Sequence, residues 1–360
     1  MPLARAMLDM AKARTVLDDE RFAEKDLSAT TRFDLLMLKA AAADDVGDRK
    51  AAMQLLDKAR ALNAASSETW NAEAKLRIRS GQLREAQTAA EKAIALAPGQ
   101  AMALYVRGTV AHTQGDLKGA IAYYDKALQA SPDHVDGLVS RAGLLLDLNR
   151  PVEAARDVQA LLKVDPNDAR GVYLSALLAE RDGRAADAKA ALAKVTALLD
   201  PIPIEMLRYR SQLLLLGGLA HFALDETEKA KPYLEGVLRD QPGSPAAKVM
   251  ARIHLKENNF ERAIEALEGY RRQHPKDAQA TLLLASAHLA QGRHTRAIAL
   301  LQAAQQQDSR PEFQHALGMA YMKAGQFTSA LAELEAAYKR NPKAKINGTS
   351  LAALYLQRCV

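Results

Sequence analysis

Apolar and small residues recur along the chain at helical spacing, in paired segments with a turn-forming residue between them. One such pair covers residues 70–79 and 83–96, and Gly81 lies between the two segments. A left-handed backbone costs glycine least, so Gly81 predicts the turn of a helical hairpin. Pro98 follows the second segment, where a residue without an N–H cannot continue a helix.

The same pattern returns after thirty-four residues. The residues that mark the first unit are Trp70, Ala74, Gly81, Ala86, Ala93 and Pro98, and their counterparts are Leu104, Gly108, Gly115, Ala120, Ala127 and Pro132. A fixed period of this length is typical of a solenoid built from helical hairpins. We therefore expect an all-α fold in one continuous array.

One alanine position extends this period along most of the chain. It is occupied by Ala52, Ala86, Ala120, Ala154, Ala188, Ala230, Ala263, Ala297 and Ala330. Small side chains at a constant interval let helix backbones approach closely, so we expect these alanines to be buried. The interval is longer by eight residues between Gly183 and Asp225, which predicts an enlarged connection near 200–210.

Three segments follow from this register. Residues 1–32 are expected to hold one helix, about 3–17, as a degenerate partial repeat. Residues 33–342 form the array of nine units, and residues 343–360 form a closing helix or the start of a truncated repeat.

The pattern resembles the tetratricopeptide-repeat (TPR) family over about residues 33–342. The resemblance implies hairpins of antiparallel helices in a right-handed superhelix, with the first helix of each hairpin lining a concave groove. More narrowly, the chain resembles the TPR proteins of bacterial exosortase/PEP-CTERM exopolysaccharide systems. That likeness rests on residues 16–19 (VLDD), on residues 173–178 (YLSALL) and on the irregular unit near 200–242.

Composition and charge exclude several functional classes. The net charge of +6 is mild for 360 residues and its charges are interleaved, so nucleic-acid binding is not favoured. The single cysteine, Cys359, excludes an intramolecular disulfide and a cysteine-based metal cluster. The longest uncharged apolar run, 211–224, is too short to span a bilayer. The first residues do not resemble a secretory segment, so we expect a cytoplasmic location, or a periplasmic one if a signal has been removed.

Catalytic patterns are missing from the sequence. His288 and His294 lack the His-Glu-x-x-His spacing of a helical zinc site, and Gly217-Gly218 lacks the Gly-Lys-Ser/Thr of a phosphate loop. His221, His254 and His288 share one repeat position with Tyr321 and are expected to be half-buried core groups. We therefore expect no enzyme, no cofactor and no metal site.

The function that remains is binding of another molecule. We expect the side chains on the first helices that point away from the core alanines to form the binding surface. The residues expected on this groove are Asn71, Lys75, Arg79, Tyr105, Thr109, His112, Arg170, Tyr173, Leu177, Leu215, Leu219, Phe222, Lys248, Arg252 and Lys256. Such a surface suits an extended peptide or a helix with apolar anchors and acidic flanks. Asn71 and Lys75 stand in swapped order relative to carboxylate-clamp TPR domains, so that specificity does not carry over.

These features favour a non-catalytic scaffold or adaptor that binds a protein or peptide. The preferred role is in bacterial cell-envelope polysaccharide assembly. The ends of the array also allow self-association. Two alternatives remain open. One is the regulatory array of a larger enzyme such as a glycosyltransferase, and the other is an RNA-binding helical-repeat protein, which would show binding with a steep salt dependence.

Overall fold

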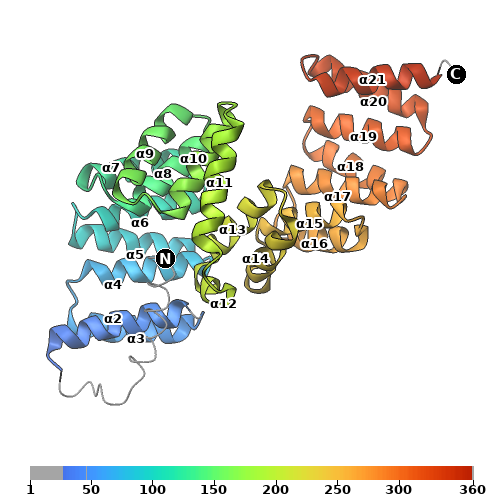
Figure 1. Cartoon of the computed structure of the whole chain (residues 1–360). Coiled ribbons are helices and arrows are strands. Elements are labelled where there is room, and N and C mark those ends of the chain that lie inside the picture. The colour runs from blue at the N-terminus through green and yellow to red at the C-terminus, as the bar shows by residue number, and fades with distance from the viewer. Residues whose placement is uncertain (1–26, 46, 359–360) are drawn as a thin grey trace. The chain divides into compact units, whose positions relative to one another are not determined.

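The computed structural model describes residues 27–45 and 47–358, and all regular elements in these ranges are helices (Figure 1). The predicted all-α class is confirmed for this part of the chain. The helix expected at about 3–17 and the residue Cys359 lie outside the described residues.

The chain divides into two compact units, and the boundary along the sequence falls between Asp225 and Glu226. The helices of the first unit are α2 (Ala29–Asp45), α3 (Arg49–Leu62), α4 (Ser67–Arg79), α5 (Leu83–Leu96), α6 (Ala101–Thr113), α7 (Leu117–Ala130), α8 (Val135–Asp147), α9 (Pro151–Val164), α10 (Ala169–Arg181), α11 (Ala185–Leu199), α12 (Ile204–Leu207), the 3₁₀ turn η2 (Arg208–Arg210) and α13 (Ser211–Ala223). The helices of the second unit are α14 (Thr227–Asp240), α15 (Ala246–Lys256), α16 (Phe260–Gln273), α17 (Ala278–Ala290), α18 (His294–Gln307), α19 (Pro311–Lys323), α20 (Phe327–Arg340) and α21 (Lys345–Arg358).

Within each unit, successive helices pack as hairpins that stack on one another (Figure 1). The turn residues inside these hairpins have a positive φ, as Gly81 and its counterpart Gly115 predict. They are Gly47, Gly81, Gly115, Asn149, Gly183, Asn258, Gly292 and Gly325, and Asp225 at the boundary between the units also has a positive φ. Asn149 adopts φ 60°, which is consistent with asparagine being the next choice after glycine for a left-handed turn.

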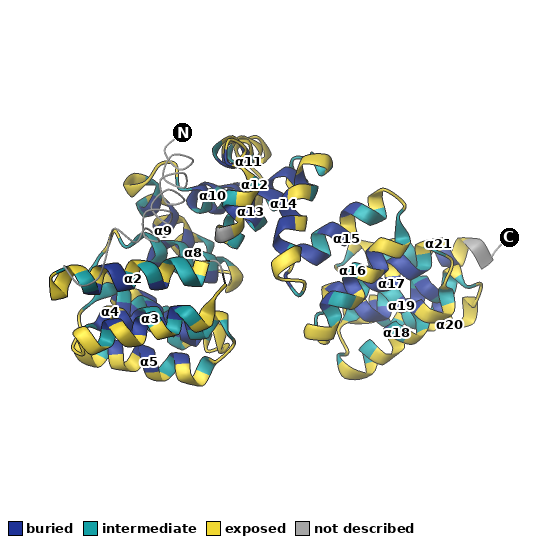
Figure 2. Ribbon diagram, turned by 90° about the horizontal axis from the view of Figure 1, so that it is seen from below, coloured by how far each residue is buried: buried dark blue, intermediate teal, exposed yellow. Residues whose placement is uncertain are grey.

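The periodic alanines are buried in both units, as predicted. Figure 2 shows the buried positions where helices face one another and the exposed positions on their outer sides. Gly108 illustrates how close the helices approach, because a Cβ atom there would lie 2.7 Å from the Tyr124 ring. Small side chains at these sites let α6 and α7 pack at this distance.

The enlarged connection between α11 and α13 is a packed segment. It contains α12 and η2, and Ile202 and Leu207 bury their side chains within the first unit. Asp200 places its Oδ1 atom 2.8 Å from Nε2 of His221, which has no exposed surface. His288 is also buried and His254 is intermediate, so the three histidines are core or half-buried groups.

Candidate functional site

Four residues from consecutive first helices of the first unit form a connected polar and aromatic surface. They are Lys75 on α4, Tyr105 on α6, Asp136 on α8 and Arg170 on α10, and we call this surface the first-helix face. Hydrogen bonds at the N-terminal ends of α10 and α8 fix where these two helices begin. The Asp168 side chain accepts hydrogen bonds from the backbone N–H groups of Arg170 and Gly171 at 2.8 and 3.1 Å, which fixes the start of α10.

The α8 end is fixed in a similar way. Nδ1 of His134 accepts a hydrogen bond from the backbone N–H of Gly137 at 2.9 Å. Burial lowers the pKa of His134, with the nearby Asp136 carboxylate opposing the shift. The neutral ring is therefore favoured, and it is the form that can accept this hydrogen bond.

Arg170 joins α10 to α8. Its guanidinium lies 2.7 Å from Oδ1 of Asp136 and 2.7 Å from Oδ2 of Asp168. Burial lowers the pKa of Arg170, but the hydrogen bonds to both carboxylates outweigh it and raise the pKa overall. The sequence predicts the positive charge of Arg170 on the groove, and in the structure this charge is paired with the Asp136 and Asp168 carboxylates of the same unit.

Tyr105 lies at the centre of the first-helix face. Its ring is 5.1 Å from His134 and 6.0 Å from Tyr124, measured between ring centroids. Burial raises the pKa of Tyr105. The sequence predicts Tyr105 on the groove, and its ring is half-buried because it packs against Tyr124 of α7 and His134 before α8.

Lys75 differs from Arg170 because it forms no ion pair with any carboxylate in the described residues. Its Nζ atom donates to Sδ of Met102 at 3.3 Å. Burial lowers the pKa of Lys75, and the Asp136 charge opposes the shift. Within the described residues, the ammonium group of Lys75 thus has a weak thioether as its hydrogen-bond acceptor.

The other groove residues predicted in α4 and α6 have local roles. Asn71 is 4% exposed and its amide has no hydrogen-bond partner, so its side chain lies in the interior and not on the groove surface where the sequence placed it. Arg79 pairs with Asp44 on α2. The Thr109 hydroxyl donates to the Tyr105 carbonyl oxygen at 3.1 Å, and His112 lies edge-on to Tyr124 with centroids 6.5 Å apart.

The remaining predicted residues lie farther along the chain. Tyr173 and Phe222 are half-buried in the first unit, and burial raises the pKa of Tyr173. Arg252 is exposed on α15 in the second unit. The binding role of these residues stays a prediction.

Lys248 takes part in a cluster that joins three helices of the second unit. Its Nζ atom is 2.9 Å from Oδ2 of Asp277, and the Tyr270 hydroxyl donates to the same oxygen at 2.8 Å. Oδ1 of Asp277 accepts from the backbone N–H of Ala280 at 2.9 Å and so caps α17. Burial alone raises the pKa of Asp277, but these hydrogen bonds outweigh it and lower the pKa to about 2.

This cluster predicts a loss of stability in acid. The pKa of Asp277 falls from 3.8 to about 2 on folding, so its contribution is complete above pH 3.8 and disappears as the pH falls toward 2. We expect a loss of about 1–2 kcal/mol over this range. The protection factor of the Ala280 amide in hydrogen exchange, which corrects for the pH dependence of the intrinsic rate, should fall more in the wild type than in Asp277→Asn between pH 5 and 2.5. An equal fall in both proteins would contradict this role.

The described residues contain no cluster of three His, Cys, Asp or Glu side chains able to hold a metal ion. Within the same residues, no helix combines the length and apolar character needed to cross a bilayer.

The sequence interpretation did not include Asp136, His134 and Asp168 in the site. A signal for one of them was present, because Asp136 and Arg170 occupy equivalent positions one period of thirty-four residues apart. Opposite charges at the same position of neighbouring repeats lie on adjacent first helices and can form an ion pair. The cap residues carried a weaker signal, since Asp168 directly precedes a helical segment.

Two family models, both described as tetratricopeptide repeat, match this chain. One matches residues 71–135 and 248–311, and the other matches residues 111–179 and 288–355. Together they cover more than half of the chain.

Individual proteins are also similar. Anaphase-promoting complex subunit 7 of Arabidopsis thaliana is 27% identical over 178 residues, which are 49% of this chain and 30% of that protein. The crystal structure of the APC/C hetero-tetramer Cut9-Hcn1 aligns with a TM-score of 0.68 at 15% identity, over 94% of this chain and 66% of that chain. A tetratricopeptide repeat protein from Parabacteroides merdae aligns with a TM-score of 0.46 at 20% identity, over 70% of this chain and 97% of that chain. The chain therefore spans less than two thirds of the length of the first two proteins.

Proposed function

Since the chain belongs to the tetratricopeptide-repeat family, we propose that it is a non-catalytic scaffold that binds a protein or peptide partner on its first-helix face. The observation that supports this most is the linkage of Lys75, Tyr105, Asp136 and Arg170 across four first helices. Rigid side chains lose little freedom when a partner binds, so such a surface is suited to recognition.

The chemistry of the face suggests what the partner presents. Lys75 lacks an ion pair within the described chain and suits a carboxylate, whereas Arg170 is already neutralised by Asp136 and Asp168. Tyr105 offers a ring that is held in place and suits an apolar or aromatic group. We infer a partner segment with one acidic residue near one apolar anchor.

Replacing Tyr105 with alanine should weaken binding of such a segment by about 2 kcal/mol, or about 30-fold in Kd. The aromatic anchor is lost from the centre of the surface. The segment is obtained by selecting peptides from a displayed random library against the whole chain, and its affinity is measured by calorimetry.

The control for this experiment is Tyr338→Ala on α20, because Tyr338 is an exposed tyrosine that does not belong to the first-helix face. Since Tyr105 packs on Tyr124 and His134, the melting temperature of Tyr105→Ala is measured in parallel. A folded Tyr105→Ala variant with unchanged affinity would place the binding surface elsewhere.

We propose that the scaffold works within a multi-protein assembly. The structurally similar Cut9-Hcn1 assembly is a hetero-tetramer, which motivates this role without naming the partners of this chain. Self-association through α21 is a further part of the proposal, because Ile346 and Leu356 expose 60% and 71% of their surface. A monomer in sedimentation velocity would remove that part. The polysaccharide-assembly setting rests on the sequence resemblance alone.

A further inference from the structure

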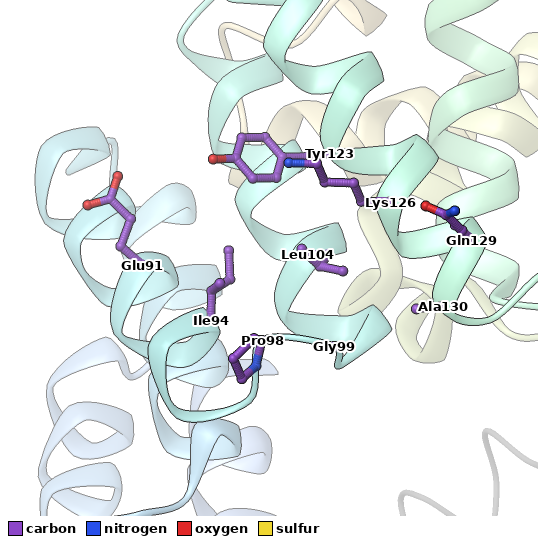
Figure 3. A pocket seen from close by; sticks show the side chains of 9 residues that line it. All are labelled: Glu91, Ile94, Pro98, Gly99, Leu104, Tyr123, Lys126, Gln129 and Ala130. Carbon is purple, nitrogen blue, oxygen red and sulfur yellow. The ribbon is translucent and has the colours of Figure 1, made fainter.

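A pocket of about 530 Å³ opens between α5, α6 and α7 of the first unit. Ile94, Pro98 and Leu104 give it an apolar lining, while Tyr123, Lys126 and Glu91 stand around it (Figure 3). The volume lies in the range of small-ligand pockets, about 300–1,000 Å³. Its lining comes mainly from the second helices of two hairpins and includes none of the four residues of the first-helix face.

The repeat pattern shows what this space holds one unit earlier. There Trp70 lies between two cations, with the Arg60 guanidinium 3.8 Å and the Lys92 ammonium 4.2 Å from its ring centroid. Counting forward by thirty-four residues, Ile94 replaces Arg60, Leu104 replaces Trp70 and Lys126 replaces Lys92. All three replacements line the pocket.

The pocket therefore corresponds to the position that the Trp70 indole occupies one repeat earlier, where this repeat has the smaller Leu104. Leucine is smaller than tryptophan, so Leu104 leaves part of the space open. Tyr123 compensates in part, since it replaces Ala89 one period earlier. Its ring forms one wall, with Arg107 4.9 Å and Lys126 5.4 Å from its centroid, and the open volume remains beside it.

We propose that this pocket, which we call the indole slot (Ile94, Leu104, Tyr123 and Lys126), binds an aromatic side chain of a partner protein, with tryptophan as the best fit. The floor of Ile94 and Leu104 accepts the flat ring. Lys126 is placed to lie over it, as Lys92 lies over Trp70. Arg107 holds the Glu91 carboxylate at 3.5 Å near the rim, where it can accept the indole N–H.

The site is tested with N-acetyl-tryptophanamide as the probe and the full chain as the receptor, followed by NMR titration of the backbone amides. We expect saturable binding with shifts centred on α5, α6 and α7. N-acetyl-cyclohexylalaninamide, which is apolar without an aromatic ring, should bind at least several times more weakly. Equal binding of both probes, or no saturable binding of the tryptophan probe, would overturn the proposal.

Variants then locate the site. Leu104→Trp restores the indole of the neighbouring unit, so it should weaken probe binding at least tenfold. Ile94→Trp fills the slot from α5 and provides the same test if Leu104→Trp does not fold. Lys126→Ala removes only the cation and should weaken binding about two- to fivefold.

Val152→Trp is the matched control, because Val152 is exposed on α9 outside the slot. This variant should bind the probe as the wild type does. Tyr105→Ala should also leave probe binding unchanged, which separates this proposal from binding on the first-helix face. Undiminished binding in folded Leu104→Trp or Ile94→Trp would overturn the assignment of the slot.

Discussion

Arg141→Met is expected to lower the free energy of unfolding by about 3–5 kcal/mol. Two guanidinium nitrogens of Arg141 on α8 contact the two carboxylate oxygens of Asp157 on α9, at 2.8 and 2.6 Å. Asp157 is only 4% exposed. Removing the arginine leaves a buried carboxylate without its cation, and such a group costs far more than the lost contact itself.

Denaturant unfolding followed by circular dichroism measures this effect. The matched control is Arg150→Met. Arg150 forms a similar bidentate pair with Glu153, but both of these side chains are exposed to solvent. Exposed pairs contribute about 0–1 kcal/mol, so the control should be nearly neutral. The double variant Arg141→Met/Asp157→Leu should recover most of the loss, because it removes both charges. A loss in Arg141→Met no larger than in the control would show that the buried pair does not matter.

Ala120→Leu is expected to lower the free energy of unfolding by about 3 kcal/mol, the upper end of the usual cost of overpacking. Ala120 has no exposed surface and packs with Ala111, Tyr124 and Leu144. A larger side chain would have to separate α7 from the helices it contacts. Since each repeat is stabilised by its neighbours, the loss should spread beyond one hairpin.

Lys118→Leu is the control for this variant, because Lys118 is exposed on the same helix. It introduces the same side chain without changing the packed interface. Thermal unfolding should separate the two variants by several degrees. A melting curve of Ala120→Leu that matches the control would contradict the close packing of this position.

The helical elements could be predicted because their signals are local and repeat many times. Gly81 and Gly115 marked hairpin turns, and both have a positive φ in the structure. The periodic alanines marked the positions where helices approach, and burial confirms this. Because the thirty-four-residue pattern recurs in many units, an irregularity in one unit does not change the predicted fold class.

The candidate site was predictable only in part. The sequence placed Lys75, Tyr105 and Arg170 on the first helices, and the structure connects them through Asp136 and His134. It could not show that Arg170 is neutralised by two carboxylates or that Lys248 belongs to the Asp277 cluster. Which side chain reaches which depends on rotamers and on the stagger between neighbouring helices.

The sequence by itself determined the helices, their turns and the small residues at their contacts, because these depend on backbone geometry and on one repeating interval. Only the tertiary structure decided which charges are paired and where space remains open. The indole slot shows the physical reason. Leu104 and Tyr123 together replace Trp70 and Ala89, and whether their side chains fill the same volume depends on how three helices pack around them.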